Sequence, residues 1–259
     1  MTTRARILSA LFGAVALLGL AAAVPAAGPA PQPAGKVTFL AGEASRKAAD
    51  GKAAKLAVGA PVFEGDVLET ERRTRLEVKL NDSSVVRLGP TSKAVVQAAA
   101  FGKTVDDRKV SAKLVVGQVW ANVAKAVGGE ARFEVQTENA VAGVRGTTFR
   151  VDAAKDRSVV VKVYSGTVAV AAGPIPRPRH GGEGGEQGGG GAEGGKKPGH
   201  VEIAGPQEVS REQWEKIVTN MMQVRVSADG KPTEPEEFAL AGKADEWEAW
   251  NRERDATAR

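Results

Sequence analysis

Short valine-rich runs in which apolar and polar residues alternate extend from residue 35 to residue 173, separated by glycine, asparagine or aspartate at about every tenth position. Successive side chains of a β-strand point to opposite faces, so this alternation is typical of strands with one buried face. The clearest examples are Leu76–Leu80, Phe133–Thr137 and Val159–Tyr164. The turn-forming residues Asn81–Ser84 precede Val85–Leu88, which predicts a hairpin. The pattern predicts an all-β domain of many short strands.

Residues 140–151 form the most distinctive stretch of this domain. Two glycines flank a single basic residue, and the run that follows alternates as a half-buried strand does. This predicts a sharp glycine-hinged corner that leads into a strand. We expect Arg145 either to contact a carboxylate of a partner or to donate its hydrogen bonds to carbonyl groups across the corner. The residues of this predicted structural motif are Gly143, Arg145, Gly146, Thr147 and Phe149.

The first residues have the pattern of an export signal. Arg4 and Arg6 precede an apolar run from Ile7 to Val24, and small residues follow it. We therefore predict a secretory signal over residues 1–27 that is removed from the mature protein, with a retained membrane anchor as the alternative. The chain has no cysteine, which excludes disulfides and attachment of lipid to an N-terminal cysteine.

Beyond the β-domain the composition changes twice. Residues 174–199 are rich in proline and glycine, which predicts a flexible linker. Residues 200–259 regain apolar periodicity and are expected to form a smaller C-terminal element. Its first predicted helix rests on a capping pattern and a helically spaced apolar stripe, comprising Ser210, Gln213, Trp214, Ile217, Val218 and Met221.

A second helix is predicted over Asp245–Asp255, with acidic residues in its first turn. Trp247 and Trp250 fall on one face of this helix. One hypothesis is that the two rings bind a protein or sugar partner. The other is that they pack on the β-domain or on the first helix, because large aromatic side chains usually anchor packing.

Composition argues against several functions. The net charge is only +5, basic residues are interleaved with acidic ones, and aromatic residues are scarce, so nucleic-acid binding is not expected. The two histidines, His180 and His200, lie in or beside the glycine-rich segment, where nothing fixes their geometry. The carboxylates alternate along strands or lie at turns, as on a solvated face. We predict no catalytic site, no metal site and no cofactor.

Several blocks, in this order along the chain, resemble the FecR-type domain. Asn81, Asp82 and Ser83 depart from the Asp-Gly that usually precedes serine in that family, and Ser165 replaces a commonly acidic residue. Both departures are at turns. The resemblance covers residues 35–173 and implies a twisted, solenoid-like stack of short strands outside the cytoplasmic membrane, with a β-sandwich as the alternative. The blocks are 35–37, 58–70, 80–90, 114–119, 144–149 and 164–168.

Founding members of this family relay signals from outer-membrane iron transporters to sigma factors through a cytoplasmic segment. Only six residues precede the apolar run here, so no such segment is expected. We therefore expect an exported, non-catalytic binding module of the periplasm or cell envelope that is sensory or regulatory through protein–protein contacts. The alternative is a structural or surface-polysaccharide-binding envelope protein. Its expected partner is an unidentified envelope protein or glycan, with no nucleic acid and no retained membrane span.

Overall fold

The computed structural model describes residues 32–101, 108–125, 132–144, 146–173, 215–242 and 245–257. Within them the chain forms 17 strands and one C-terminal helix, α1 (Glu246–Thr257). The predicted all-β fold with a small C-terminal helix is confirmed. The strands are β1 (Gly35–Ala41), β2 (Ala44–Lys47), β3 (Ala53–Lys55), β4 (Pro61–Val62), β5 (Val67–Thr70), β6 (Arg75–Leu80), β7 (Val85–Leu88), β8 (Lys93–Phe101), β9 (Arg108–Asn122), β10 (Arg132–Gln136), β11 (Ala140–Val144), β12 (Thr148–Ala153), β13 (Val159–Ser165), β14 (Val168–Ala172), β15 (Glu215–Val218), β16 (Met222–Val226) and β17 (Glu236–Glu237).

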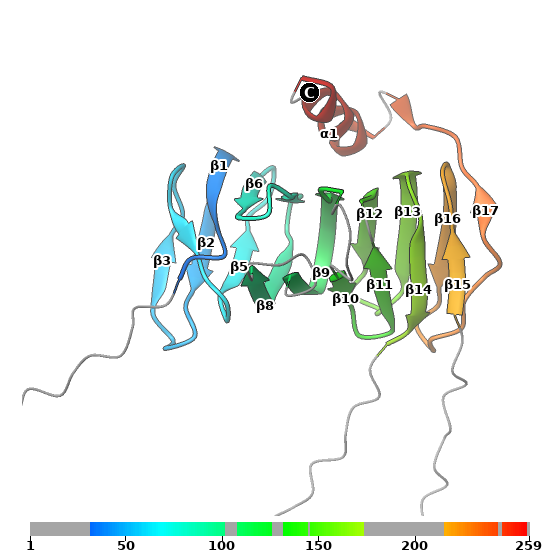
Figure 1. Cartoon of the computed structure of the whole chain (residues 1–259), viewed down its shortest axis with the longest axis horizontal. Coiled ribbons are helices and arrows are strands. Elements are labelled where there is room, and N and C mark those ends of the chain that lie inside the picture. The colour runs from blue at the N-terminus through cyan, green and yellow to red at the C-terminus, as the bar shows by residue number, and fades with distance from the viewer. Residues whose placement is uncertain are drawn as a thin grey trace, which may run out of the picture. The chain divides into compact units, whose positions relative to one another are not determined.

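The strands pair in two layers that we call sheet A and sheet B. Sheet A has the order β4–β1–β6–β7–β9–β12–β13–β16–β17. Sheet B has the order β3–β2–β5–β8–β9–β10–β11–β14–β15. The chain advances along both sheets nearly in sequence order (Figure 1), so the architecture is a solenoid-like stack whose two layers face each other as in a sandwich.

The long strand β9 belongs to both sheets. Residues 108–116 pair with β8 or β10 in sheet B, and residues 117–122 pair with β7 or β12 in sheet A. The chain bends at Gly117, whose φ of +100° is accessible to glycine but strained for other residues. A side chain there would also collide with Ser92, because an ideal Cβ lies 2.5 Å from the Ser92 Cα. Gly117 therefore permits the crossing between the sheets.

The predicted hairpin is confirmed: β6 and β7 are antiparallel, with Leu76 opposite Leu88 and Val78 opposite Val86. In its turn the Asp82 carboxylate accepts a hydrogen bond from the Ser84 amide at 2.9 Å. The predicted strands 133–137 and 159–164 correspond to β10 and β13 within about two residues.

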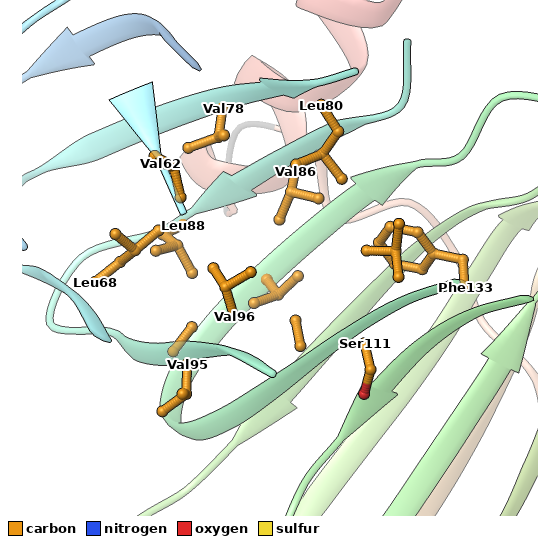
Figure 2. Close-up of a pocket in the computed structure, with 14 residues that line it drawn as sticks. Val62, Leu68, Val78, Leu80, Val86, Leu88, Val95, Val96, Ser111 and Phe133 are labelled. Atoms are coloured by element: carbon orange, nitrogen blue, oxygen red, sulfur yellow. The ribbon is translucent and has the colours of Figure 1, made fainter. Parts of the chain in front are cut away.

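The core lies between the two sheets. Inward-facing side chains of both layers form one apolar cluster that extends from Val37 to Val226. A small cavity of about 40 Å³ lies within it. Figure 2 shows its lining, which consists mostly of valine and leucine side chains together with Phe133 and the polar Ser111. The cavity is far smaller than the sites that hold small-molecule ligands, so it is a packing void rather than a binding site.

The first helix predicted for the C-terminal element is wrong in its described part, where β15 and β16 form instead. Ile217 is 55% exposed whereas Val218 is fully buried, which is the alternation of a strand. Val218 pairs with Val168 of β14, and Val224 pairs with Val161 of β13. The apolar residues of this segment have helical spacing, but two of them, Ile217 and Val218, are adjacent and β-branched, which favours a strand. Pairing with β14 and β13 at the ends of the two sheets therefore determines the structure of the segment. Ser210, Gln213 and Trp214 lie outside the described residues, as do the predicted signal and linker.

The helix α1 begins where the second helix was predicted. Asp245 precedes it, and its carboxylate accepts a hydrogen bond from the Glu248 amide at 2.9 Å, as an N-cap does. Figure 1 shows α1 to one side of the strands, and its side chains form hydrogen bonds with β6, β7, β9 and β13 of sheet A. No helix among the described residues is both long and apolar enough to cross a membrane.

Candidate functional site

The described residues of the predicted corner lie at the crossing from β11 in sheet B to β12 in sheet A. Gly146 has a φ of +61°, and an ideal Cβ there would lie 3.3 Å from the Lys125 Cα. Thr147 is buried and donates a hydrogen bond from its hydroxyl group to the Thr167 carbonyl at 2.9 Å. Phe149 is fully buried in the core. These contacts hold the corner in place.

The other two residues of the predicted corner motif, Gly143 and Arg145, are not among those that the structure places at the corner. Gly143 lies in the middle of β11, opposite Glu134 of β10 and Ala169 of β14, and takes an extended conformation. Arg145 lies outside the described residues, so neither of the two hypotheses about its side chain is tested. A role of this corner in binding stays a prediction.

Trp247 and Trp250 both pack against the β-domain. Trp247 is 6% exposed, and its ring stacks on that of Trp250 at 5.3 Å between centroids. The Trp250 ring contacts Phe39 of β1 at 5.4 Å, and the Arg75 guanidinium lies 5.3 Å from its centroid. Gly89 makes room for the helix, since a Cβ there would be 3.2 Å from the Trp247 ring. The structure brings the two predicted tryptophans together in packing, and their role in partner binding stays a prediction.

Beside the tryptophans, a group of buried charges joins α1 to sheet A. Glu77 of β6 accepts hydrogen bonds from Arg87 of β7 at 2.7 Å and from Arg254 of α1 at 2.9 Å. Arg87, whose side chain is 2% exposed, also donates to Asp255 at 2.7 Å. The other oxygen of Asp255 accepts a hydrogen bond from the Trp120 indole at 2.9 Å. Glu77, Arg87 and Asp255 therefore each have an opposite charge within hydrogen-bond distance.

The electrostatics of Glu77 follow from these contacts. Burial by itself would raise its pKa, but hydrogen bonds from Arg254, Arg87 and Thr38 stabilise the carboxylate and lower the pKa to about 2. Glu77 is therefore ionised at neutral pH although its side chain is only 9% exposed.

A second charged group lies nearer the start of α1. Arg150 of β12 pairs with Asp152 at 2.8 Å and with Asp245, the N-cap of α1. Burial opposes its charge, but the two carboxylates raise the pKa of Arg150. Next to it, the Tyr164 hydroxyl donates to the fully buried Glu248 at 3.0 Å. Burial and the charge of Glu248 raise the pKa of Tyr164.

We define the helix-covered face as the surface of sheet A formed by Glu77, Arg87, Trp120, Arg150 and Tyr164. None of these residues was predicted from the sequence, in which carboxylates that alternate along strands indicated a solvated face. That interpretation is wrong for Glu77, which is buried beneath α1. One sequence feature could have pointed to this face. The predicted second helix is rich in aspartate, arginine and tryptophan, which indicates that it packs on a surface of matching charge.

The described residues contain no group of three or more His, Asp or Glu side chains placed to hold a metal ion. Both histidines lie outside the described residues. The helix-covered face instead combines carboxylates with aromatic rings and guanidinium groups, and the last two are the side-chain groups most enriched in protein–protein interfaces. The fold and this face define a class: a two-layered, all-β domain that binds a helix through ion pairs and aromatic rings.

The sequence places the chain more narrowly. The family model for FecR protein matches residues 66–169, which confirms the predicted FecR-type domain over that range. The family is regulatory rather than enzymatic and is associated with the cell envelope. No curated protein matches the chain.

Solved structures show a looser similarity. Two crystal structures of a candidate anti-sigma factor from Parabacteroides distasonis are each 17% identical, with a TM-score of 0.44. Each alignment covers 69% of this chain and 62% of the other, so the chain spans less than two thirds of that protein's length. A structure described as a cell surface anchoring domain is 24% identical with a TM-score of 0.24, and covers 24% of this chain and 82% of that one. These scores are too low to support a functional argument.

Proposed function

We propose that this protein is an exported, non-catalytic regulatory module of the cell envelope that acts by binding another protein. The observation that carries this proposal is the FecR domain, whose family is regulatory. The helix-covered face adds support, because it recognises the helix α1 of the same chain with the residue types that dominate protein–protein contacts. A matching helix or acidic segment from another protein would meet the same chemistry.

The titration of the site supports a non-catalytic role. A general acid or base works best when its pKa lies near the operating pH. The pKa of Glu77 is lowered to about 2, and the pKa of Tyr164 is raised above its ordinary value near 10. Both pKa shifts move away from neutral pH, so Glu77 stays ionised and Tyr164 stays protonated at pH 7.

Cross-linking in cells that produce the tagged full-length protein tests the proposal. The protein-binding function predicts one discrete cross-linked species that contains a second protein and that saturates as expression rises. The structural alternative predicts bulk association with wall or polysaccharide, which glycan-degrading enzymes release. Recovery of the protein only with that fraction would overturn the proposal and favour the alternative.

Export has its own test. The apolar run and the small residues after it predict a mature protein that starts between Ala26 and Ala34, which intact-mass measurement reads directly. A membrane-bound product that keeps residues 1–20 would show that the segment is an anchor and that the proposed cleavage is wrong.

A further inference from the structure

Three arginines of sheet A each face a carboxylate from the segment that carries α1. Arg87 pairs with Asp255 at 2.7 Å, Arg150 pairs with Asp245, and Arg75 lies 3.7 Å from Glu246. These three ion pairs show which chemical group the arginines bind on this side of the molecule. That group is a side-chain carboxylate presented by a peptide segment.

Two further arginines stand beside this series and have no carboxylate. Arg72 and Arg73 are exposed in the turn between β5 and β6, and within the described residues no ion pair joins either one to an acidic group. Together with Arg75 they line a cleft of about 620 Å³ at the start of α1, which we call the arginine cleft. Its other lining residues are Ala41, Pro90, Thr91, Glu246 and Trp247.

The backbone holds this cleft in an unusual conformation at two places. Arg73 has a φ of +58° and Thr91 has a φ of +51°, in the left-handed region that is unfavourable for residues with a Cβ. The Thr74 and Thr91 amides both donate to the Glu71 carbonyl, at 3.3 and 3.1 Å. These bonds fix the turn, so the arginine side chains project from a defined base.

Trp247 forms part of the wall of the cleft, and the nitrogen of its indole ring is itself buried. Its side chain is 94% buried, and its indole N–H has no acceptor among the residues that the structure describes. The three arginines that line the cleft are all hydrogen-bond donors, and an anionic acceptor suits all of them.

We propose that the arginine cleft binds an acidic peptide segment of a protein partner, with carboxylates on Arg72 and Arg73. This inference rests on the proposed protein-binding function and names the chemistry of the partner. Guanidinium groups bind carboxylates through paired, charge-assisted hydrogen bonds. The cleft volume suits a few residues of peptide. Glu246 already places one carboxylate beside Arg75 at the rim of the cleft. An acidic segment of a partner would add the same kind of arginine–carboxylate pair at Arg72 and Arg73.

The test measures binding of an acetylated, fluorescein-labelled hexaglutamate peptide to the mature full-length protein by fluorescence anisotropy at low ionic strength. The double variant Arg72→Gln with Arg73→Asn removes both charges, and asparagine tolerates the left-handed backbone at position 73. The matched control is Lys36→Gln with Lys79→Gln. These exposed lysines face each other on β1 and β6, and their loss changes the net charge equally.

We expect the arginine variant to bind hexaglutamate about fivefold more weakly than the parent, or weaker still, and the lysine variant to bind like the parent. Hexaglutamine should not bind. Equal weakening in both variants would show attraction by net charge alone and overturn the proposal. Stronger, arginine-dependent binding to phosphatidylglycerol vesicles than to the peptide would also overturn it, in favour of a lipid surface.

The two proposals fail in different ways. Loss of hexaglutamate binding with a saturable cross-linked partner still present would remove the arginine cleft but keep the protein-binding function. Arginine-dependent peptide binding without any partner protein in cells would leave the cleft intact and count against the proposed function.

Discussion

Replacement of Glu77 by glutamine removes the central acceptor of the charges beneath α1. The side chain receives hydrogen bonds from Arg87 at 2.7 Å, from Arg254 at 2.9 and 3.1 Å, and from Thr38 at 2.7 Å. Glutamine has nearly the same shape but no charge, and its amide donors would face two guanidinium groups. Arg87 would then keep only Asp255 as a charged partner in a position that is 2% exposed.

Two routes give the size of the effect. The pKa of Glu77 falls from 4.5 to about 2, and each tenfold change in proton affinity is about 1.4 kcal/mol, which makes about 3 kcal/mol of stability at neutral pH. Breaking one side of a buried ion pair costs about 3–5 kcal/mol in other proteins. We therefore expect Glu77→Gln to lower the free energy of unfolding by about 3 kcal/mol at pH 7.

The pH dependence has a defined sign. A carboxyl group whose pKa is lowered on folding contributes stability that is complete above its unfolded pKa and is lost as the pH falls through its folded pKa. The difference in stability between parent and Glu77→Gln should thus be constant above about pH 4.5 and shrink towards about pH 2.

Urea unfolding followed by circular dichroism at several pH values measures this difference. Glu237→Gln, which changes an exposed glutamate on β17, is the control and should change stability by less than about 0.5 kcal/mol. The reasoning is refuted if Glu77→Gln destabilises by less than about 1 kcal/mol at pH 7, or if its deficit stays the same down to pH 2.

Three further predictions test other parts of the structure. Gly117→Ala should destabilise by about 2–4 kcal/mol in denaturant melts because it adds a clash with Ser92 to the backbone strain, whereas Gly59→Ala, with a φ of +90° and open space around it, should cost only about 1 kcal/mol. Gly146→Val should cost about 1–3 kcal/mol, and an unchanged midpoint would contradict strain at the corner. Trp247→Ala with Trp250→Ala should lower the melting temperature and speed amide exchange in α1, and a parent-like melt would show that the rings do not anchor the helix.

The sequence was informative wherever neighbouring residues determine the outcome. The alternation in Leu76–Leu80 and the turn after it were sufficient to predict the β6–β7 hairpin, and the acidic residues before Trp247 were sufficient to place α1. The family motifs identified the FecR domain. All these signals lie within a few residues of the structure that they predict.

Long-range packing accounts for what the sequence did not reveal. The sequence around Val218 is compatible with an apolar stripe of a helix and with a strand. It forms a strand because Val218 pairs with Val168 of β14, about 50 residues earlier in the chain. Likewise, nothing beside Arg87 in the sequence indicates that Asp255 will cover it. A charge on the outer face of a strand is exposed or buried according to what the rest of the chain places on that face.

The pairing of β14 with β15 has a thermodynamic consequence. Ala171 and Glu215 are neighbours across this pair, so the roughly 40 residues between them join points that a turn of about four residues could join. For a flexible chain, closure of a connection of roughly 40 residues costs about 2 kcal/mol more than closure of one of about four. None of the strand pairings of the described residues involves residues 174–214, so backbone cleavage there would leave those pairings unbroken. A nicked molecule would keep the mass of the whole in native gels and separate into two fragments only on denaturation.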